Sequence, residues 1–379
     1  MPLNNCYILR RSMPRLYNIK PLTFNFQFSI SPMHLADTTI QHIAVHAVGN
    51  KQLDEPLTLS HELLNVSEEV KNLLKTYFLF PFKSEEYFQL FHEDGVEQND
   101  IYKAATAIFD DPDSLLEQSL YMAQHLYNQC NHPKIKDGEF YVVYFKDCVL
   151  DDEQVDAVGL FKAETKDSFL KIHQEDDKFV VESDFGFGLN KLDKGCLILN
   201  TEKERGYVLS VVDNTNRGGE AQYWMDDFLH CRQRKDEYYN TQSMLTLCKE
   251  FVTDYMPEQF EEVSKADQAE ILNRSVNFFK ENKTFEMEDF KQEVIGNEEL
   301  IESFDTYKEE FQQANDMVVP DSFGISDSAI KKQSRNFKSV IKLDKNFHIY
   351  VHGDTKRIKK GVDPETGLNY YQLFFEEEY

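Results

Sequence analysis

The sequence has no apolar run long enough to cross a membrane. A spanning helix needs about 18 to 20 consecutive apolar residues, whereas the longest runs here have the length of one buried strand. The chain also lacks any C-x-x-C pair, because its six cysteines stand singly, several of them inside apolar runs. This spacing excludes the common zinc and disulfide frameworks. We therefore expect a cytoplasmic protein with no membrane span, no metal and no cofactor.

Positive charge is scarce, since 41 Lys and Arg stand against 67 Asp and Glu and give a net charge of −26. A nucleic-acid duplex would repel such a molecule at long range. The two signs are nevertheless separated along the chain. Asp254 to Asp316 holds 18 acidic and 6 basic residues, a net charge of −12, and Lys331 to Lys360 holds 10 basic and 2 acidic residues, a net charge of +8. We therefore expect a local positive surface on an anionic molecule.

The middle of the chain is rich in short apolar or alternating segments, which predict strands. Clear examples are Phe140–Phe145, Phe169–His173, Phe179–Glu182, Cys196–Leu199 and Tyr207–Val212. The connections between successive segments are short, which favours an antiparallel arrangement.

A loop with Asn216, Gly218 and Gly219 follows the last of these strands and leads into a helical pattern around Trp224. A glycine-rich loop before a helix suits a phosphate group. The spacing matches no known phosphate-binding motif, however, and a tight turn needs the same residues. We favour the turn.

Composition and the period of the hydrophobic pattern divide the chain into four predicted parts. Residues 1–32 carry four basic residues and no acid, and we expect a disordered extension ahead of a natural start at Met33. Residues 33–235 form a mainly antiparallel sheet domain with helices, residues 236–316 an acidic helical module, and residues 317–379 a small basic α/β unit. The predicted fold class is α+β.

Capping residues mark the expected helix starts. Ser264 is followed three places later by Asp267, which is a variant of the capping box. The expected caps are Ser60, Ser264, Thr284, Asn297 and Ser326.

The C-terminal unit alternates with period two, so that Ile341, Phe347, Ile349 and Val351 face a core. The other face then presents basic residues together with His348, Tyr350 and His352. Such a face suits phosphates and a stacked base. Pairing of the same cations with the acidic helices of the chain is an equally favoured alternative. The candidate nucleic-acid contacts are Lys331, Lys332, Arg335, Lys338, Lys342, Lys345, Lys356, Arg357, Lys359 and Lys360.

A second, weaker candidate site is catalytic. Asp156 with Glu164 and Lys166 has roughly the spacing of a metal-dependent nuclease of the PD-(D/E)xK type. Acids and lysines are so common in this chain that one such match is expected by chance.

Ordered segments of the chain resemble the bacterial nucleoid-associated protein family that includes the YejK-type proteins, in particular its Bacteroidetes-like members. The resemblance extends from about Ile40 to the C-terminus and leaves residues 1–32 outside. It implies a cytoplasmic, nucleoid-associated protein that binds DNA, and it brings no catalytic motif with it. The segments are IAVHAVGNK at 43–51, HPKIKDGEFYVVYFKDC at 132–148, LNKLDKGCLILNTEKERGYVLSVVDNTNRGGEAQYWMDDFL at 189–229, SKADQAEILNRSVNFFKEN at 264–282 and ISDSAIKKQSRNFKSVIKLDKNFHIYVHG at 325–353.

We therefore expect a non-enzymatic nucleoid-associated protein that binds DNA without sequence specificity through the basic C-terminal face. Two alternatives stay open: a metal-dependent nuclease or other phosphoryl-transfer enzyme, and an acidic interaction factor that binds a basic nucleoid protein. A homo-oligomer is compatible with the sequence.

Overall fold

A computed structural model describes residues 33–215, 222–260, 263–337, 340–351 and 357–377. The predicted extension 1–32 and the glycines of the loop 216–221 lie outside these residues, as do Lys338 and Lys356. No helix within the described ranges is long and apolar enough to cross a membrane.

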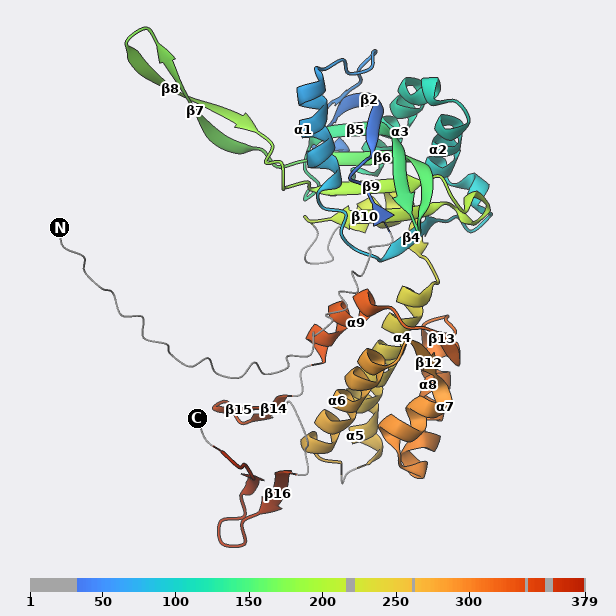
Figure 1. The fold of residues 1–379 in the computed structure, drawn as a ribbon, viewed down its shortest axis with the longest axis vertical. Helices are drawn as coiled ribbons and strands as arrows, with labels where there is room; N and C mark the ends of the chain where they lie inside the picture. The colour runs from blue at the N-terminus through green and yellow to red at the C-terminus, as the bar shows by residue number, and fades with distance from the viewer. Residues whose placement is uncertain (1–32, 216–221, 261–262, 338–339, 352–356, 378–379) are drawn as a thin grey trace, which may run out of the picture. The chain divides into compact units, whose positions relative to one another are not determined.

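The largest element is a nine-stranded sheet whose ladders are all antiparallel (Figure 1). The strand order is β11-β4-β10-β9-β6-β5-β2-β3, and β1 pairs with β5 beside β2. The strands are β1 (Met33–His34), β2 (Thr39–Val48), β3 (Leu57–Thr58), β4 (Tyr87–Leu90), β5 (Gly138–Leu150), β6 (Glu153–Ala163), β9 (Lys194–Leu199), β10 (Val208–Asp213) and β11 (Cys231–Gln233).

Both faces of this sheet are buried, because helices lie on either side (Figure 1). Val142 and Tyr144 of β5 join the core beneath α2 (Asp100–Asp110) and α3 (Leu115–Gln129). Val143 belongs to the opposite core, with Phe78 of α1 (Glu68–Leu79). The side chains of a strand alternate between faces, so a strand covered on both sides is apolar at nearly every position.

The predicted cap at Ser60 is wrong, because Ser60 and Leu64 donate backbone hydrogen bonds to β2 before any helix begins. The Ser60 N–H donates to His46 Nδ1 at 3.1 Å, and the Leu64 N–H donates to the Ile43 carbonyl at 2.8 Å. Helix α1 begins only after Ser67, whose hydroxyl accepts from Val70 N.

Thr284 also begins a strand rather than a helix. It opens β12 (Thr284–Glu286), which pairs with β13 (Ser322–Gly324). The predicted caps Ser264, Asn297 and Ser326 are confirmed, each by a side-chain oxygen that accepts a backbone N–H.

A second core, rich in phenylalanine, joins the helices of the C-terminal half. The ring of Phe285 stacks on Phe279 and Phe323 with centroids 5.4 and 4.7 Å apart. Ile330 and Phe337 belong to the same core. The helices are α4 (Glu237–Glu250), α5 (Met256–Gln259), α6 (Lys265–Glu281), α7 (Met287–Phe290), α8 (Glu298–Ala314) and α9 (Asp327–Gln333).

Three further hairpins, among the described strands, pair only within themselves. The fold class α+β with a mainly antiparallel sheet is confirmed, and the domain boundaries at 235 and 316 stay predictions. The hairpins are β7 (Asp167–Glu175) with β8 (Lys178–Gly186), β14 (Val340–Leu343) with β15 (Phe347–Tyr350), and β16 (Ile358–Val362) with β17 (Asn369–Leu373).

The described cysteines are free thiols and lie inside these cores or at their edge. Cys130 and Cys196 belong to one core of the large sheet, Cys148 to the other, and Cys248 to the phenylalanine core. Cys231 is partly buried. They fill space as small hydrophobic side chains.

Candidate nucleic-acid interface

The first predicted contacts lie on α9 and in the turn after it. Ser326 caps this helix, which buries Ala329 and Ile330 and leaves Lys331 and Arg335 exposed. Lys332 is also exposed, but its ammonium forms an ion pair with Glu86. Of these three cations, Lys331 and Arg335 present their charge to solvent without an ion pair to any described residue.

The β14–β15 hairpin places Lys342, His348 and Tyr350 on one face, as the alternation predicts. Lys342 lies directly opposite His348 in the ladder, and Tyr350 lies opposite Val340. Ile341 and Val351 pack on the other side against Ala266 and Ala269 of α6. Tyr350 is 61% exposed, which leaves an aromatic surface open to stacking beside a cation.

Phe347 does not join this small core, contrary to the prediction. It is 64% exposed. Alternation fixes which side of a strand a residue faces, but α6 covers only part of that side, so a residue at the hairpin end stays in solvent.

The remaining predicted cations lie in the β14–β15 turn, directly before β16 and on β16. Lys345, Lys359 and Lys360 are exposed. Lys359 Nζ lies 5.4 Å from the centroid of the Phe374 ring. Arg357 forms an ion pair with Glu376 at 2.7 Å within the same C-terminal segment.

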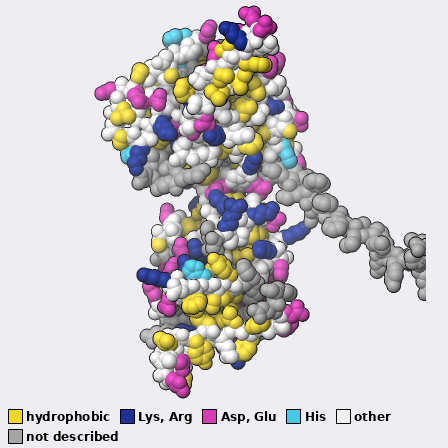
Figure 2. Space-filling model, turned by 90° about the vertical axis from the view of Figure 1, so that its left-hand side faces the viewer, with side chains coloured by type: hydrophobic (Ala, Val, Ile, Leu, Met, Phe, Trp, Pro, Cys, Tyr) yellow, Lys and Arg dark blue, Asp and Glu magenta, His cyan; other side chains and the backbone are white. Residues whose placement is uncertain are grey.

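Internal neutralisation of these cations was the alternative to DNA binding. Within the described ranges, no ion pair joins a basic side chain of 331–360 to a carboxylate of 254–316. The acidic helices pair with their own lysines instead, as in Lys291 with Asp305 at 2.6 Å. Figure 2 shows exposed Lys and Arg side chains on the face drawn, with Asp and Glu side chains interspersed among them.

The predicted nuclease residues do not come together. Asp156 lies near the start of β6 and Glu164 follows its end, so their Cα atoms are about 26 Å apart along an extended chain. Two ligands of one metal ion lie within a few ångströms of it. Asp156 accepts a hydrogen bond from the Tyr144 hydroxyl at 2.7 Å, and Lys166 pairs with Glu139.

Glu164 is instead part of a buried polar network at the end of β6. Its carboxylate lies 3.2 Å from Lys162 Nζ and accepts from the Tyr223 hydroxyl at 3.0 Å. Lys162 also donates to the Lys136 carbonyl at 2.6 Å and is fully buried. Burial, reinforced by the Glu164 charge, raises the pKa of Tyr223 well above its usual range, so this hydroxyl stays a donor.

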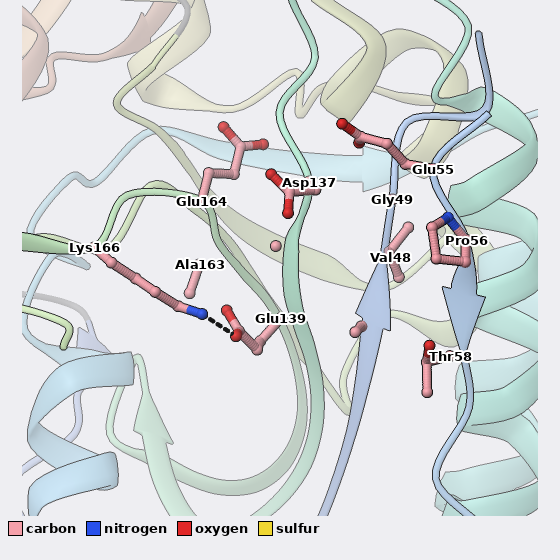
Figure 3. Close-up of a pocket in the computed structure, with 12 residues that line it drawn as sticks. Val48, Gly49, Glu55, Pro56, Thr58, Asp137, Glu139, Ala163, Glu164 and Lys166 are labelled. Carbon is pink, nitrogen blue, oxygen red and sulfur yellow. Dashed lines mark hydrogen bonds and ion pairs between the residues drawn. The ribbon is translucent and has the colours of Figure 1, made fainter. Parts of the chain in front are cut away.

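A polar pocket of about 360 Å³ opens beside this network. Figure 3 shows the carboxyl groups of Glu55, Asp137 and Glu164 along one side of it and Lys166 joined to Glu139. Glu55 accepts from Asn50 N at 2.7 Å. Among the described residues, no three His, Cys, Asp or Glu side chains are grouped to hold a metal ion.

A family model described as nucleoid-associated protein YejK matches residues 44–366. The match spans most of the chain, including the large sheet from β2 onward and the whole of 331–360. The chain belongs to this family. The resemblance predicted from the sequence segments is thereby confirmed, and membership supports a nucleoid-associated role. No curated protein sequence matches the chain.

One cation of this YejK-type chain beside the predicted face was missed. Lys265, the first residue of α6, lines with Lys342 a pocket of about 270 Å³, together with Thr253 and Gln268. A lysine in the first turn of a helix opposes the helix dipole, which favours acidic residues there. That unfavourable position is the signal by which the sequence could have revealed it.

Proposed function

We propose that this nucleoid-associated protein acts in the cytoplasm and contacts DNA directly, without sequence specificity, through the exposed cations between Lys331 and Lys360. The observation that carries the proposal is the lack of ion pairs, within the described ranges, between these cations and the acidic helices. A cation already paired inside the chain gains little from a phosphate, whereas a solvated one releases counterions on binding.

The salt dependence of binding follows from the number of free cations. Six of the predicted residues are exposed and form no ion pair with another described residue: Lys331, Arg335, Lys342, Lys345, Lys359 and Lys360. If all six contact phosphates, the log–log slope of affinity against salt is about −5. A titration by fluorescence anisotropy at several salt concentrations measures this slope.

Charge reversal tests the location. We expect Lys342→Glu, Lys345→Glu, Lys359→Glu and Lys360→Glu together to weaken binding to duplex DNA at least about 100-fold, since each lost phosphate contact removes affinity. The matched control reverses four exposed basic residues of the sheet domain that form no ion pair with another described residue, and it changes the net charge equally: Lys83→Glu, Lys136→Glu, Lys146→Glu and Arg205→Glu.

The control distinguishes the loss of a specific DNA-binding site from the effect of a more negative net charge. Near-normal binding by the control supports the proposal, and equal weakening of both variants contradicts it. Unrelated duplexes of equal length should bind with equal affinity.

A second candidate function is supported by α8, whose outer surface is acidic. Glu298, Glu302, Glu309 and Glu310 are exposed on it, and a basic nucleoid protein would complement that charge. A tagged chain would then retain its partner after nuclease treatment and lose it when these four residues are changed to glutamine.

A further inference from the structure

The β7–β8 hairpin, residues Asp167–Gly186, is here called the hairpin arm. Among the described strands, β7 pairs only with β8, and every residue of β7 is exposed. A two-stranded hairpin without a covering layer is at best marginally stable in water. An arm of this length therefore needs a surface to pack against.

One face of the arm is apolar and carries no charge. In an antiparallel ladder, residues directly opposite one another lie on the same face, so the register defines this face. Its five large apolar side chains are between 59% and 76% exposed: Leu170, Ile172, Phe179, Val181 and Phe185. The rest of the uncharged face consists of Ser168, Gln174 and Ser183.

The opposite face carries the charged residues of the two strands. They are Asp167, Lys171, Glu175, Lys178, Glu182 and Asp184. A sheet with one apolar and one charged face buries the apolar one. The distribution of charge thus predicts that the uncharged face of the hairpin arm is the one that packs against another surface.

DNA does not fit the uncharged face. The arm from Asp167 to Gly186 contains six acidic and two basic residues, a net charge of −4, and a duplex would repel it. No cation lies on the uncharged face to contact a phosphate. The occupant must instead be an apolar, uncharged surface.

A second copy of the chain supplies such a surface. Five side chains of this size expose on the order of 100 Å² each, so two copies would bury about 1,000 Å² in total, the lower limit for a specific interface. Each chain carries a net charge of −26, and contact through an uncharged face keeps those charges out of the interface.

The face is also complementary to itself. Its four rows, from the base of the arm to the tip, are Ser168 with Phe185, Leu170 with Ser183, Ile172 with Val181, and Gln174 with Phe179. Each end row holds one phenylalanine and one polar residue, and the inner rows hold the aliphatic ones. A two-fold axis between the inner rows therefore brings like rows together.

We propose that the uncharged face of the hairpin arm packs on the same face of a second copy, with the two arms running in opposite directions. Sheets pack about 10 Å apart, less than the width of a sheet covered by helices, so parallel arms would bring the two bodies into collision. With the arms opposed, Phe179 of one copy meets Phe185 of the other, and Leu170 meets Ile172.

Sedimentation of the full-length protein without DNA tests this assembly. We expect a dimer at micromolar concentration that persists or strengthens at high salt, because apolar contact resists screening. We expect Leu170→Glu with Phe179→Glu to weaken the dimer at least 100-fold. The matched control Phe169→Glu with His173→Glu adds two charges to the opposite face of β7 and should remain dimeric. Equal far-ultraviolet circular dichroism would show that both variants are folded.

Mixing variants tests the direction of the arms. Leu170→Lys and Ile172→Glu should each be monomeric alone and form a mixed dimer together, because the two positions meet only when the arms are opposed. A wild-type chain that stays monomeric to about 100 μM, or an equal effect of the two double variants, would overturn the proposal. Since no DNA is present, failure here leaves the proposed DNA contact untouched.

Discussion

Strands β6 and β7 follow one another along the chain but lie in opposite environments, because β6 is buried on both faces whereas β7 has one apolar and one charged face, both exposed. In β6, the side chains of Val158 and Phe161 are fully buried. In β7, Leu170 and Ile172 are more than half exposed. The difference lies in what covers the strands, since helices pack on both faces of β6. Alternation therefore shows which face is apolar, but not which body covers it.

The same contrast holds for charge. Lys162 on β6 is fully buried and has Glu164, Tyr223 and a backbone carbonyl as partners, whereas Lys171 on β7 is exposed. A buried ammonium needs such partners because its desolvation costs several kcal/mol. A lysine is therefore accommodated on both strands, but loss of an interaction partner should destabilise the fold far more at the buried Lys162 than at the exposed Lys171.

The largest expected effect comes from removing a phenylalanine ring in each setting. Phe161 stacks on Phe78 with centroids 4.3 Å apart, so Phe161→Ala should lower the free energy of unfolding by about 3–5 kcal/mol. Phe179→Ala, at a residue that is 76% exposed, should change this free energy by less than about 0.5 kcal/mol in the monomer. Urea unfolding at low protein concentration measures both, and similar losses would contradict the comparison.

Replacing a lysine should also lower the free energy of unfolding much more on β6 than on β7. Lys162→Met keeps most of the stem volume but leaves the Glu164 carboxylate buried without its cation, at a cost of about 3 kcal/mol. Lys171→Met should cost less than about 0.5 kcal/mol. Restoration of stability by Glu164→Gln in the Lys162→Met background would assign the loss to the unpaired charge; no restoration would assign it to packing.

The smallest effect is a pH dependence at a buried histidine of β2. Burial lowers the pKa of His46 from 6.5 to about 4, and its Nδ1 already accepts from Ser60 N. The unfolded chain thus binds the proton more readily than the folded chain. Neutral His46 therefore contributes its full share of the unfolding free energy above pH 6.5, and this share declines as the pH falls toward 4. Between pH 7 and pH 5 the chain should lose about 2 kcal/mol of unfolding free energy. In His46→Gln this part of the pH dependence should vanish, and its persistence would point to another group.

The strands and most helices could be predicted from the sequence because they depend on local period and caps. Ser264, Asn297 and Ser326 cap helices by hydrogen bonds within three residues. Ser60 and Thr284 have the same chemistry but begin segments that pair with distant strands. Long-range pairing overrides a capping preference worth about 1 kcal/mol.

The candidate site was predictable in composition and in part in geometry. Register alone places Lys342, His348 and Tyr350 on one face, so alternation sufficed. Lys265 lies about 75 residues earlier in the chain and reaches the same pocket only because α6 packs on β14. The Lys162, Glu164 and Tyr223 network likewise joins residues distant in sequence, and a linear pattern carries no such information.

The free thiols are spread over separate cores, and this gives the chain a built-in reporter. Burial raises the pKa of Cys148 to about 11 and that of Cys248 to about 12, which leaves almost no reactive thiolate at neutral pH. An alkylating reagent therefore modifies each thiol only after its surroundings open. Cys148 then marks the opening of the large sheet and Cys248 that of the helices, so one labelling time course distinguishes which half of the molecule opens first.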